Sequence, residues 1–156
     1  MVGPVNSTGG SAVRETAEKP VDPKQQEFGK CVADIMTERA KMAARAAGQS
    51  ENSVESRFDN DYEGRAEFRG VVDDSDLMIG AGATIAYKTG ELQTYGQLGS
   101  GFISTAQMLD GSERTEKAEG LTFGPGDSDN SQAWKPLVLH NIMTEGLPEQ
   151  IKSQCD

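Results

Sequence analysis

The chain has 156 residues and a net charge of −10, and 35% of its residues are hydrophobic. A chain of about this length buries roughly 68–70% of its unfolded surface, so one domain with a true core can form. Its acidity repels phosphate groups and excludes nucleic acid and anionic lipid as expected partners. The sequence shows neither the roughly 18 apolar residues of a membrane span nor the pattern of a signal peptide. We therefore expect a soluble protein that does not bind membranes, with its localisation left unknown.

The negative charge is concentrated in the middle of the chain. Residues 51–130 contain six Lys/Arg and sixteen Asp/Glu, whereas residues 23–50 contain five basic and three acidic side chains. Charges of opposite sign on different parts of a surface favour oriented association. The sequence therefore predicts protein partners with a basic surface, or self-assembly of copies packed basic face to acidic face.

The N-terminal residues 1–22 have the composition of a flexible arm. They consist mostly of Gly, Ser, Thr, Pro, Glu and Lys, which bury too little apolar surface to offset the entropy of ordering. We expect residues 1–22 to form a flexible N-terminal arm and residues 23–156 to form a single α+β domain.

A long amphipathic helix is predicted after this arm. Asp22 can act as N-cap and Pro23 suits the first helical position, while apolar residues recur at helical spacing from Phe28 to Ala46. Gly48 is placed to end the helix. The apolar stripe predicts a core-facing helix of about 25 residues.

From Arg57 onward the pattern is typical of β-structure. Short runs rich in β-branched and aromatic residues alternate with turn signals, and the runs are residues 68–72, 77–79, 83–89, 92–95, 101–108 and 121–123. Such spacing predicts an antiparallel meander of about five or six strands. The fold class we expect is α+β, with one long N-terminal amphipathic helix packed on this sheet.

The C-terminal part is strongly apolar at residues 133–143. Pro136 argues against a helix interior before it, so this stretch is expected to be an edge strand or a helix that starts at Pro136. Residues 144–153, with Pro148 in a first-turn position and Ile151 as an apolar contact, predict a short closing helix.

Two glycine-containing motifs do not fit nucleotide-binding sites. Gly80-Ala81-Gly82 lacks the third glycine of a dinucleotide fingerprint, and a strand pattern follows it instead of a helix. Residues 82–89 resemble a phosphate loop, but Tyr87 replaces a required glycine and Lys88 suits a solvated strand position. No cofactor is therefore expected.

Two acidic segments have partial calcium-loop character. Asp59–Gly64 has oxygen ligands at the first, third and fifth positions of a calcium loop, but Gly70 replaces the glutamate at the twelfth. Asp127–Asn130 offers three oxygen side chains. Both segments are more typical of acidic surface turns, so we assign no metal site.

His140 is the only histidine, which excludes zinc sites built on three histidines. Its apolar neighbours favour a structural role, and the block of sixteen carboxylates carries no weight as a glycosidase pair without geometry. We assign no catalytic, cofactor-binding or metal-binding residue.

Cys31 and Cys155 lie near opposite ends of the expected domain. The sequence leaves two states open, a disulfide or two unpaired thiols, and slightly favours the unpaired thiols because two cysteines are a weak indication of an oxidising compartment.

These observations favour a non-enzymatic structural or interaction protein, such as a subunit of a virion or an appendage. The alternative is an exported or cytosolic inhibitor or immunity-type protein whose acidic surface binds a basic target protein. A disulfide between Cys31 and Cys155 would favour this alternative. A third hypothesis is a small hydrolase or isomerase that uses His140.

Overall fold

We describe the fold from a computed structural model, for residues 23–58, 63–72, 77–121 and 130–155. The predicted arm at residues 1–22 lies outside these ranges, as do parts of both predicted calcium loops. The elements in chain order are α1 (Pro23–Ala46), a single 3-10 turn η2 (Glu51–Ser53), β1 (Val54–Phe58), β2 (Glu63–Val71), β3 (Met78–Ala86), β4 (Glu91–Leu98), β5 (Gly101–Met108), β6 (Thr115–Glu119), α2 (Asn130–Thr144) and α3 (Leu147–Cys155).

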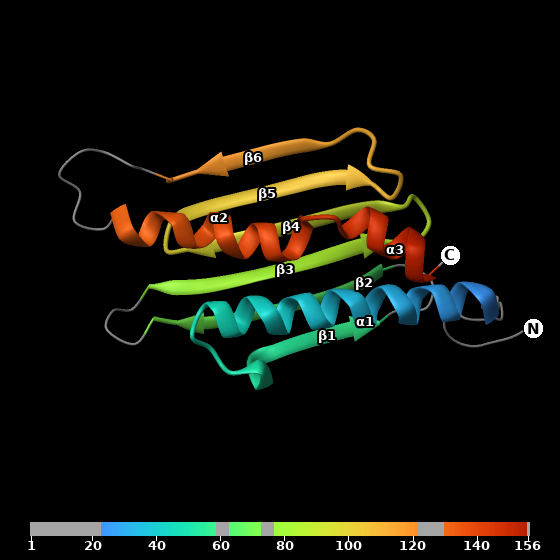
Figure 1. Cartoon of the computed structure of the whole chain (residues 1–156), viewed down its shortest axis with the longest axis horizontal. Coiled ribbons are helices and arrows are strands. Elements are labelled where there is room, and N and C mark those ends of the chain that lie inside the picture. The colour runs from blue at the N-terminus through green and yellow to red at the C-terminus, as the bar shows by residue number, and fades with distance from the viewer. Residues whose placement is uncertain (1–22, 59–62, 73–76, 122–129, 156) are drawn as a thin grey trace, which may run out of the picture.

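The strands form one six-stranded sheet in the order β1-β2-β3-β4-β5-β6. Every neighbouring pair is antiparallel, so each strand pairs with the next one in the chain. The three described α-helices lie on one face of this sheet, with α1 across β1, β2 and β3 and α2 across β3, β4 and β5 (Figure 1). The predicted fold class, α+β with a long N-terminal helix on an antiparallel sheet, is confirmed.

Helix α1 follows its sequence pattern closely. It begins at Pro23 and ends at Ala46, and Gly48 has a φ of 74°, the left-handed conformation that lets the chain leave the helix. Its apolar stripe contacts the helix-facing side chains of the sheet. The shared core contains Val32, Ile35, Met36, Ala40, Ala43, Ala44, Ala66, Phe68, Ile79, Ala81, Ala83, Ile85, Leu92, Leu98, Leu139, Met143, Leu147 and Ile151.

The strand boundaries differ from the prediction in several places. Strand β1, Val54–Phe58, was not predicted, and β2 begins at Glu63, five residues before the predicted run at residues 68–72. The runs predicted at residues 77–79 and 83–89 are one strand, β3, which runs through Gly80-Ala81-Gly82 and ends at Ala86. Lys88 therefore lies in a turn and not in a strand. The last strand occupies Thr115–Glu119, and Leu121, the described part of the run predicted at residues 121–123, lies outside it.

The prediction that Pro136 excludes a helix before it is wrong. Helix α2 begins at Asn130 and continues through Pro136 to Thr144. Proline removes one backbone donor from a helix, but packing of an apolar face outweighs such a local loss. That packing is close here, because a Cβ atom at Gly96 on β4 would overlap the carbonyl of Pro136 and lie 2.7 Å from the backbone nitrogen of His140.

The expectation of unpaired thiols is also wrong. Cys31 on α1 and Cys155 at the end of α3 form a disulfide, with their Cα atoms 5.6 Å apart. Gly146, with a φ of 66°, separates α2 from α3 and redirects the chain toward α1. The predicted closing helix is confirmed as α3, with Pro148 in its first turn. None of the described helices is both long and apolar enough to cross a membrane.

Candidate functional site

His140 lies in the core between α2 and the sheet, and its side chain is only 2% exposed. Its Nε2 atom and the Thr105 Oγ1 atom lie 2.6 Å apart and share a hydrogen bond. Burial lowers the pKa of His140 below its usual 6.5, and Glu116 acts in the opposite direction. At neutral pH the ring is therefore uncharged and shielded from solvent, an arrangement suited to holding α2 on the sheet.

The other motifs from the sequence do not assemble a site. Gly80-Ala81-Gly82 lies within β3, where no helix N-terminus is available for a phosphate. Within the part of the chain that the structure describes, no group of three or more His, Cys, Asp or Glu side chains is placed to hold a metal ion. Asp59 and Asp127 lie outside the described residues, so the expectation of no metal site in the two calcium-loop segments stays a prediction.

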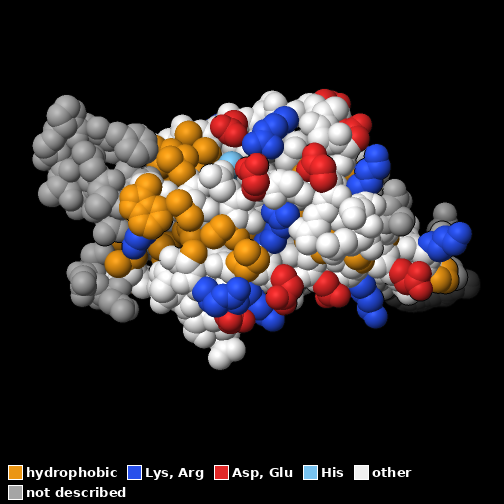
Figure 2. All heavy atoms as spheres, viewed as in Figure 1, with side chains coloured by type: hydrophobic (Ala, Val, Ile, Leu, Met, Phe, Trp, Pro, Cys, Tyr) orange, Lys and Arg blue, Asp and Glu red, His pale blue; other side chains and the backbone are white. Residues whose placement is uncertain are grey.

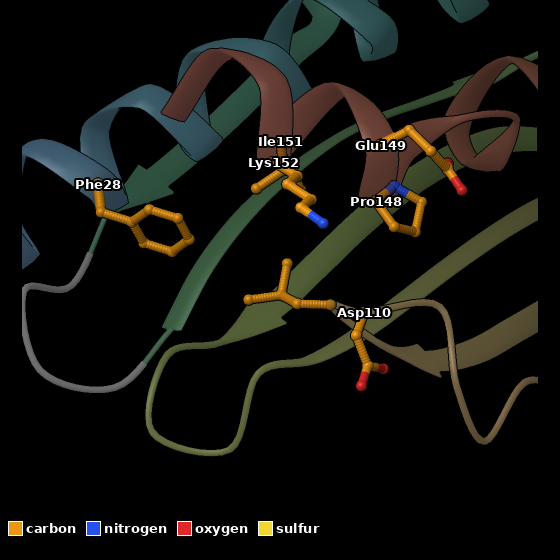
Figure 3. A pocket seen from close by; sticks show the side chains of 7 residues that line it. Phe28, Asp110, Pro148, Glu149, Ile151 and Lys152 are labelled. Carbon is orange, nitrogen blue, oxygen red and sulfur yellow. The ribbon is translucent and has the colours of Figure 1, made fainter. Parts of the chain in front are cut away.

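An open pocket of about 420 Å³ lies between the start of α1, the β5–β6 turn and α3 (Figure 3). The Pro148 ring and the Lys152 side chain project into the space above this turn. Its lining consists of Phe28, Leu109, Asp110, Pro148, Glu149, Ile151 and Lys152. Phe28 and Ile151 each lie one helical turn before a cysteine of the disulfide, so the bridge joins the two helices that line the pocket.

A second hollow, which we call the α1–α2 groove, runs between the two long helices and has a volume of about 400 Å³. Its described lining consists of Ile35, Glu38, Arg39, Met42, Asn141, Ile142, Glu145 and Gln150. The stripe of α2 that borders it continues at helical spacing through Val138 to Trp134. Figure 2 shows hydrophobic side chains gathered on this face, toward the end where α2 begins.

Three large apolar side chains are exposed here, Met42 in the lining of the groove and Trp134 and Val138 on the α2 stripe that continues from it. Met42 is 48% exposed, Trp134 45% and Val138 36%. Scattered apolar residues on a surface need no explanation, but an apolar stripe that contains tryptophan is typical of protein interfaces. The α1–α2 groove is therefore the strongest candidate for a functional surface.

Arg39 lies at the end of the groove next to the junction of α2 and α3, and it holds the helices together there. Its guanidinium donates hydrogen bonds to the Gln150 side chain at 2.7 and 3.0 Å, and to the carbonyl oxygens of Ile142 and Glu145 at 3.2 and 2.7 Å. Burial lowers the pKa of Arg39, while the carboxylates of Glu145 and Glu149 act in the opposite direction. One rigid, permanently charged side chain thus ties α1 to the junction of α2 and α3.

The two ends of the groove differ in charge. Because α1 and α2 run in opposite directions, the end of α1 lies beside the start of α2 (Figure 1). Lys135 lies at this end together with Arg45, which is paired with Glu51, and Glu145 and Glu149 lie toward the other end. Lys41 and Glu38, one helical turn apart on α1, form an ion pair of 3.5 Å with each other between the two ends. The groove is therefore apolar along its length, basic at one end and acidic at the other.

This surface was not predicted from the sequence. Residues 133–143 form the most apolar stretch of the chain, and such a stretch is normally buried. Only the i, i+4 spacing of Trp134, Val138 and Ile142, once the stretch is known to be helical, places these three side chains in one stripe.

Comparison with known proteins finds no matching family model, no matching curated protein and no matching solved structure. Proposals about function therefore rest on the geometry and chemistry of this chain.

Proposed function

We propose that the protein is a non-enzymatic subunit of a larger assembly, such as a virion or a surface appendage, and that its copies contact each other through the α1–α2 groove. The observation that supports this most directly is the exposure of Met42 in the groove and of Trp134 and Val138 on the α2 stripe that continues from it. Tryptophan is enriched among the residues that dominate interface energies, since it buries a large area with few rotatable bonds.

The distribution of charge favours a second copy as the occupant. In a two-fold interface, the same surface of both subunits must be complementary to itself. A two-fold axis perpendicular to the groove would bring Lys135, at the basic end, over Glu145, at the acidic end, of the other copy. A groove that carries both signs at opposite ends meets this requirement without any other partner.

The disulfide between Cys31 and Cys155 supports an oxidising compartment, because structural disulfides persist in secreted proteins, in the periplasm and on virion surfaces. It also favours a second candidate, an exported inhibitor or immunity-type protein that binds a basic target through its acidic surface. Assembly remains our proposal because the groove combines exposed apolar side chains with both signs of charge. We do not propose His140 as a catalytic residue, since its ring is buried.

The proposal is tested by a charge swap between Lys135 on α2 and Glu145, which directly follows this helix. Lys135→Glu and Glu145→Lys each place like charges opposite one another in the two-fold contact, so each variant should associate more weakly than the natural chain. The double variant restores opposite charges and should associate again. Sedimentation velocity measures the association, and circular dichroism confirms the fold of each variant.

Two further results bear on the same contact. Trp134→Ser should weaken association by about tenfold or more, since it removes the largest apolar anchor. Arg57→Gln, an exposed change on β1, serves as the matched control and should have no effect. Equal association of all these variants would contradict the proposal.

A further inference from the structure

The face of the sheet opposite the helices, which we call the open face, has a tyrosine laid across one of its strands. A Cβ atom at Gly82 on β3 would lie 2.9 Å from Cε1 of Tyr95, and one at Gly80 would lie 3.6 Å from its hydroxyl oxygen. The Tyr95 hydroxyl donates a hydrogen bond of 2.9 Å to Glu67 on β2. The ring therefore starts on β4, crosses β3 above two glycines and is held at β2.

This tyrosine is fixed in place on several sides. Arg69 lies 3.7 Å from the Glu67 carboxylate that accepts the hydrogen bond. Burial and the neighbouring Glu67 carboxylate raise the pKa of Tyr95 to about 12, so its hydroxyl stays protonated and donates at physiological pH. A ring held at its hydroxyl end and supported by glycine backbone loses little further freedom when a ligand contacts it.

A second ring extends the aromatic surface. Phe102 on β5 and Tyr95 have ring centroids 6.4 Å apart and planes inclined by 24°. Two rings in direct face-to-face contact would be about 3.5–4 Å apart, so these nearly parallel rings are displaced sideways. Both are partly exposed, and together they border one side of a hollow on the open face.

The hollow has a volume of about 220 Å³ and is lined by Thr84, Gln93, Thr94, Tyr95, Phe102, Ser104, Thr105 and Ala106. Within the described structure, the side chains of Thr84, Gln93 and Ser104 make no hydrogen bond to another protein group. Hydroxyl and amide groups both donate and accept hydrogen bonds, so three uncommitted groups of this kind lie beside the two rings.

The lining points to one chemical class of ligand. Thr94 and Thr105 are buried on the helix side of the sheet, and the side chains that line the hollow on the open face are those of Thr84, Gln93, Tyr95, Phe102, Ser104 and Ala106. These six side chains are aromatic, small or uncharged and polar, and none of them is ionised. A matching ligand needs an apolar ring face to rest on the aromatic surface and neutral hydroxyl groups at its edge. The chain's net charge of −10 disfavours nucleotides, whose bases also stack on aromatic rings. The volume lies below the roughly 300–1,000 Å³ of drug-sized pockets, which suits a single ring.

We propose that the hollow beside Tyr95 and Phe102 binds one sugar ring of a neutral saccharide. This site lies on the face of the sheet opposite the α1–α2 groove. Saccharide binding and self-assembly are therefore independent, and either can fail without the other.

Titration of the isotope-labelled full chain with maltotriose, cellotriose and N-acetylchitotriose tests the proposal. Backbone amide signals are followed by NMR up to about 10 mM of each sugar, which detects dissociation constants on the order of 1 mM. We expect at least one saccharide to shift signals from β3, β4 and β5 around the hollow. Tyr95→Ala and Phe102→Ala should each weaken binding about tenfold or more, because each removes one ring.

Two matched variants test whether binding depends on the Tyr95 ring itself, and not on its hydroxyl group or on other parts of the open face. Tyr95→Phe keeps the ring and loses only the hydrogen bond to Glu67, so binding should remain within about threefold of that of the natural chain. Arg57→Gln, on the open face but remote from the hollow, should bind normally. The proposal is overturned by no shift with any of the three sugars, by shifts that survive both alanine variants, or by the same shifts with oligothymidylate alone.

Discussion

Gly96 on β4 and His140 on α2 are in direct backbone contact, because a Cβ atom at Gly96 would lie only 2.7 Å from the His140 nitrogen. The strand at this point accepts no side chain, since the helix backbone occupies the space. The same approach brings the His140 ring within 2.6 Å of Thr105 on the adjacent strand. The absence of a side chain at Gly96 on β4 thus determines how closely α2, with its exposed Trp134, lies on the sheet.

Gly96→Ala should therefore destabilise the protein by about 1–3 kcal/mol, since α2 must move away from the sheet to admit the methyl group. Gln93→Ala, an exposed change on the same strand, should alter the free energy of unfolding by less than about 0.5 kcal/mol. Urea denaturation of both variants measures the difference. Equal stabilities would mean that α2 does not pack this closely on β4.

Stability should fall at mildly acidic pH because of His140. Burial keeps its folded-state pKa below 6.5, so the unfolded chain binds more protons as the pH falls below about 6.5. The stabilisation from the neutral ring is complete above this pH and decreases until the lowered pKa is passed.

The comparison with His140→Gln isolates this contribution from that of the carboxylates. Gln can still hydrogen-bond to Thr105 but does not titrate, so the loss of stability between about pH 7.5 and about pH 5 should be smaller in the variant. Denaturant unfolding at both pH values gives the change in the free energy of unfolding with pH for each protein. An identical change in the natural chain and in His140→Gln would show that His140 is solvated in the folded protein.

Breaking the disulfide should cost about 2–5 kcal/mol, because the bridge closes a loop between residues separated by 124 positions. The free energy of unfolding is measured with and without reductant, both for the natural chain and for the double variant Cys31→Ser, Cys155→Ser. The double variant should have the stability of the reduced chain and should not respond to reductant. Equal stability of the natural chain and the double variant would indicate that the thiols are unpaired.

The apolar stripe of α1 should tolerate no charge. Ile35 is 6% exposed and lies in the core, so Ile35→Asp should prevent folding or cost several kcal/mol. Lys41, which forms an ion pair of 3.5 Å with Glu38 on the same helix, provides the control. Lys41→Ala should change the free energy of unfolding by less than about 1 kcal/mol by thermal denaturation. Normal folding of Ile35→Asp would place this face of α1 on the surface.

The sequence predicts those elements whose apolar spacing is regular. Helix α1 and strand β5 are examples, because one face of each is buried throughout. Strand β6 was missed because all five of its residues are exposed, so it lacks the alternation that indicates a strand. The start of α2 was missed because Pro136 argues locally against a helix before it. Packing of α2 against Gly96 overrides this local preference.

The candidate surface could not be predicted for a related reason. An apolar residue in a helical stripe is read as core, yet Trp134, near the start of α2, remains 45% exposed. The disulfide likewise depends on α3 turning back onto α1, which is a tertiary arrangement and leaves no mark in the spacing of Cys31 and Cys155.

Self-association through the α1–α2 groove is tested most directly by the mass of the protein in solution. Light scattering coupled to gel filtration, at several concentrations and with the disulfide intact, gives this mass. We expect a dimer or a larger defined oligomer that approaches the mass of a single chain in Trp134→Ser. A single-chain mass at every concentration would contradict assembly and favour the inhibitor-type alternative.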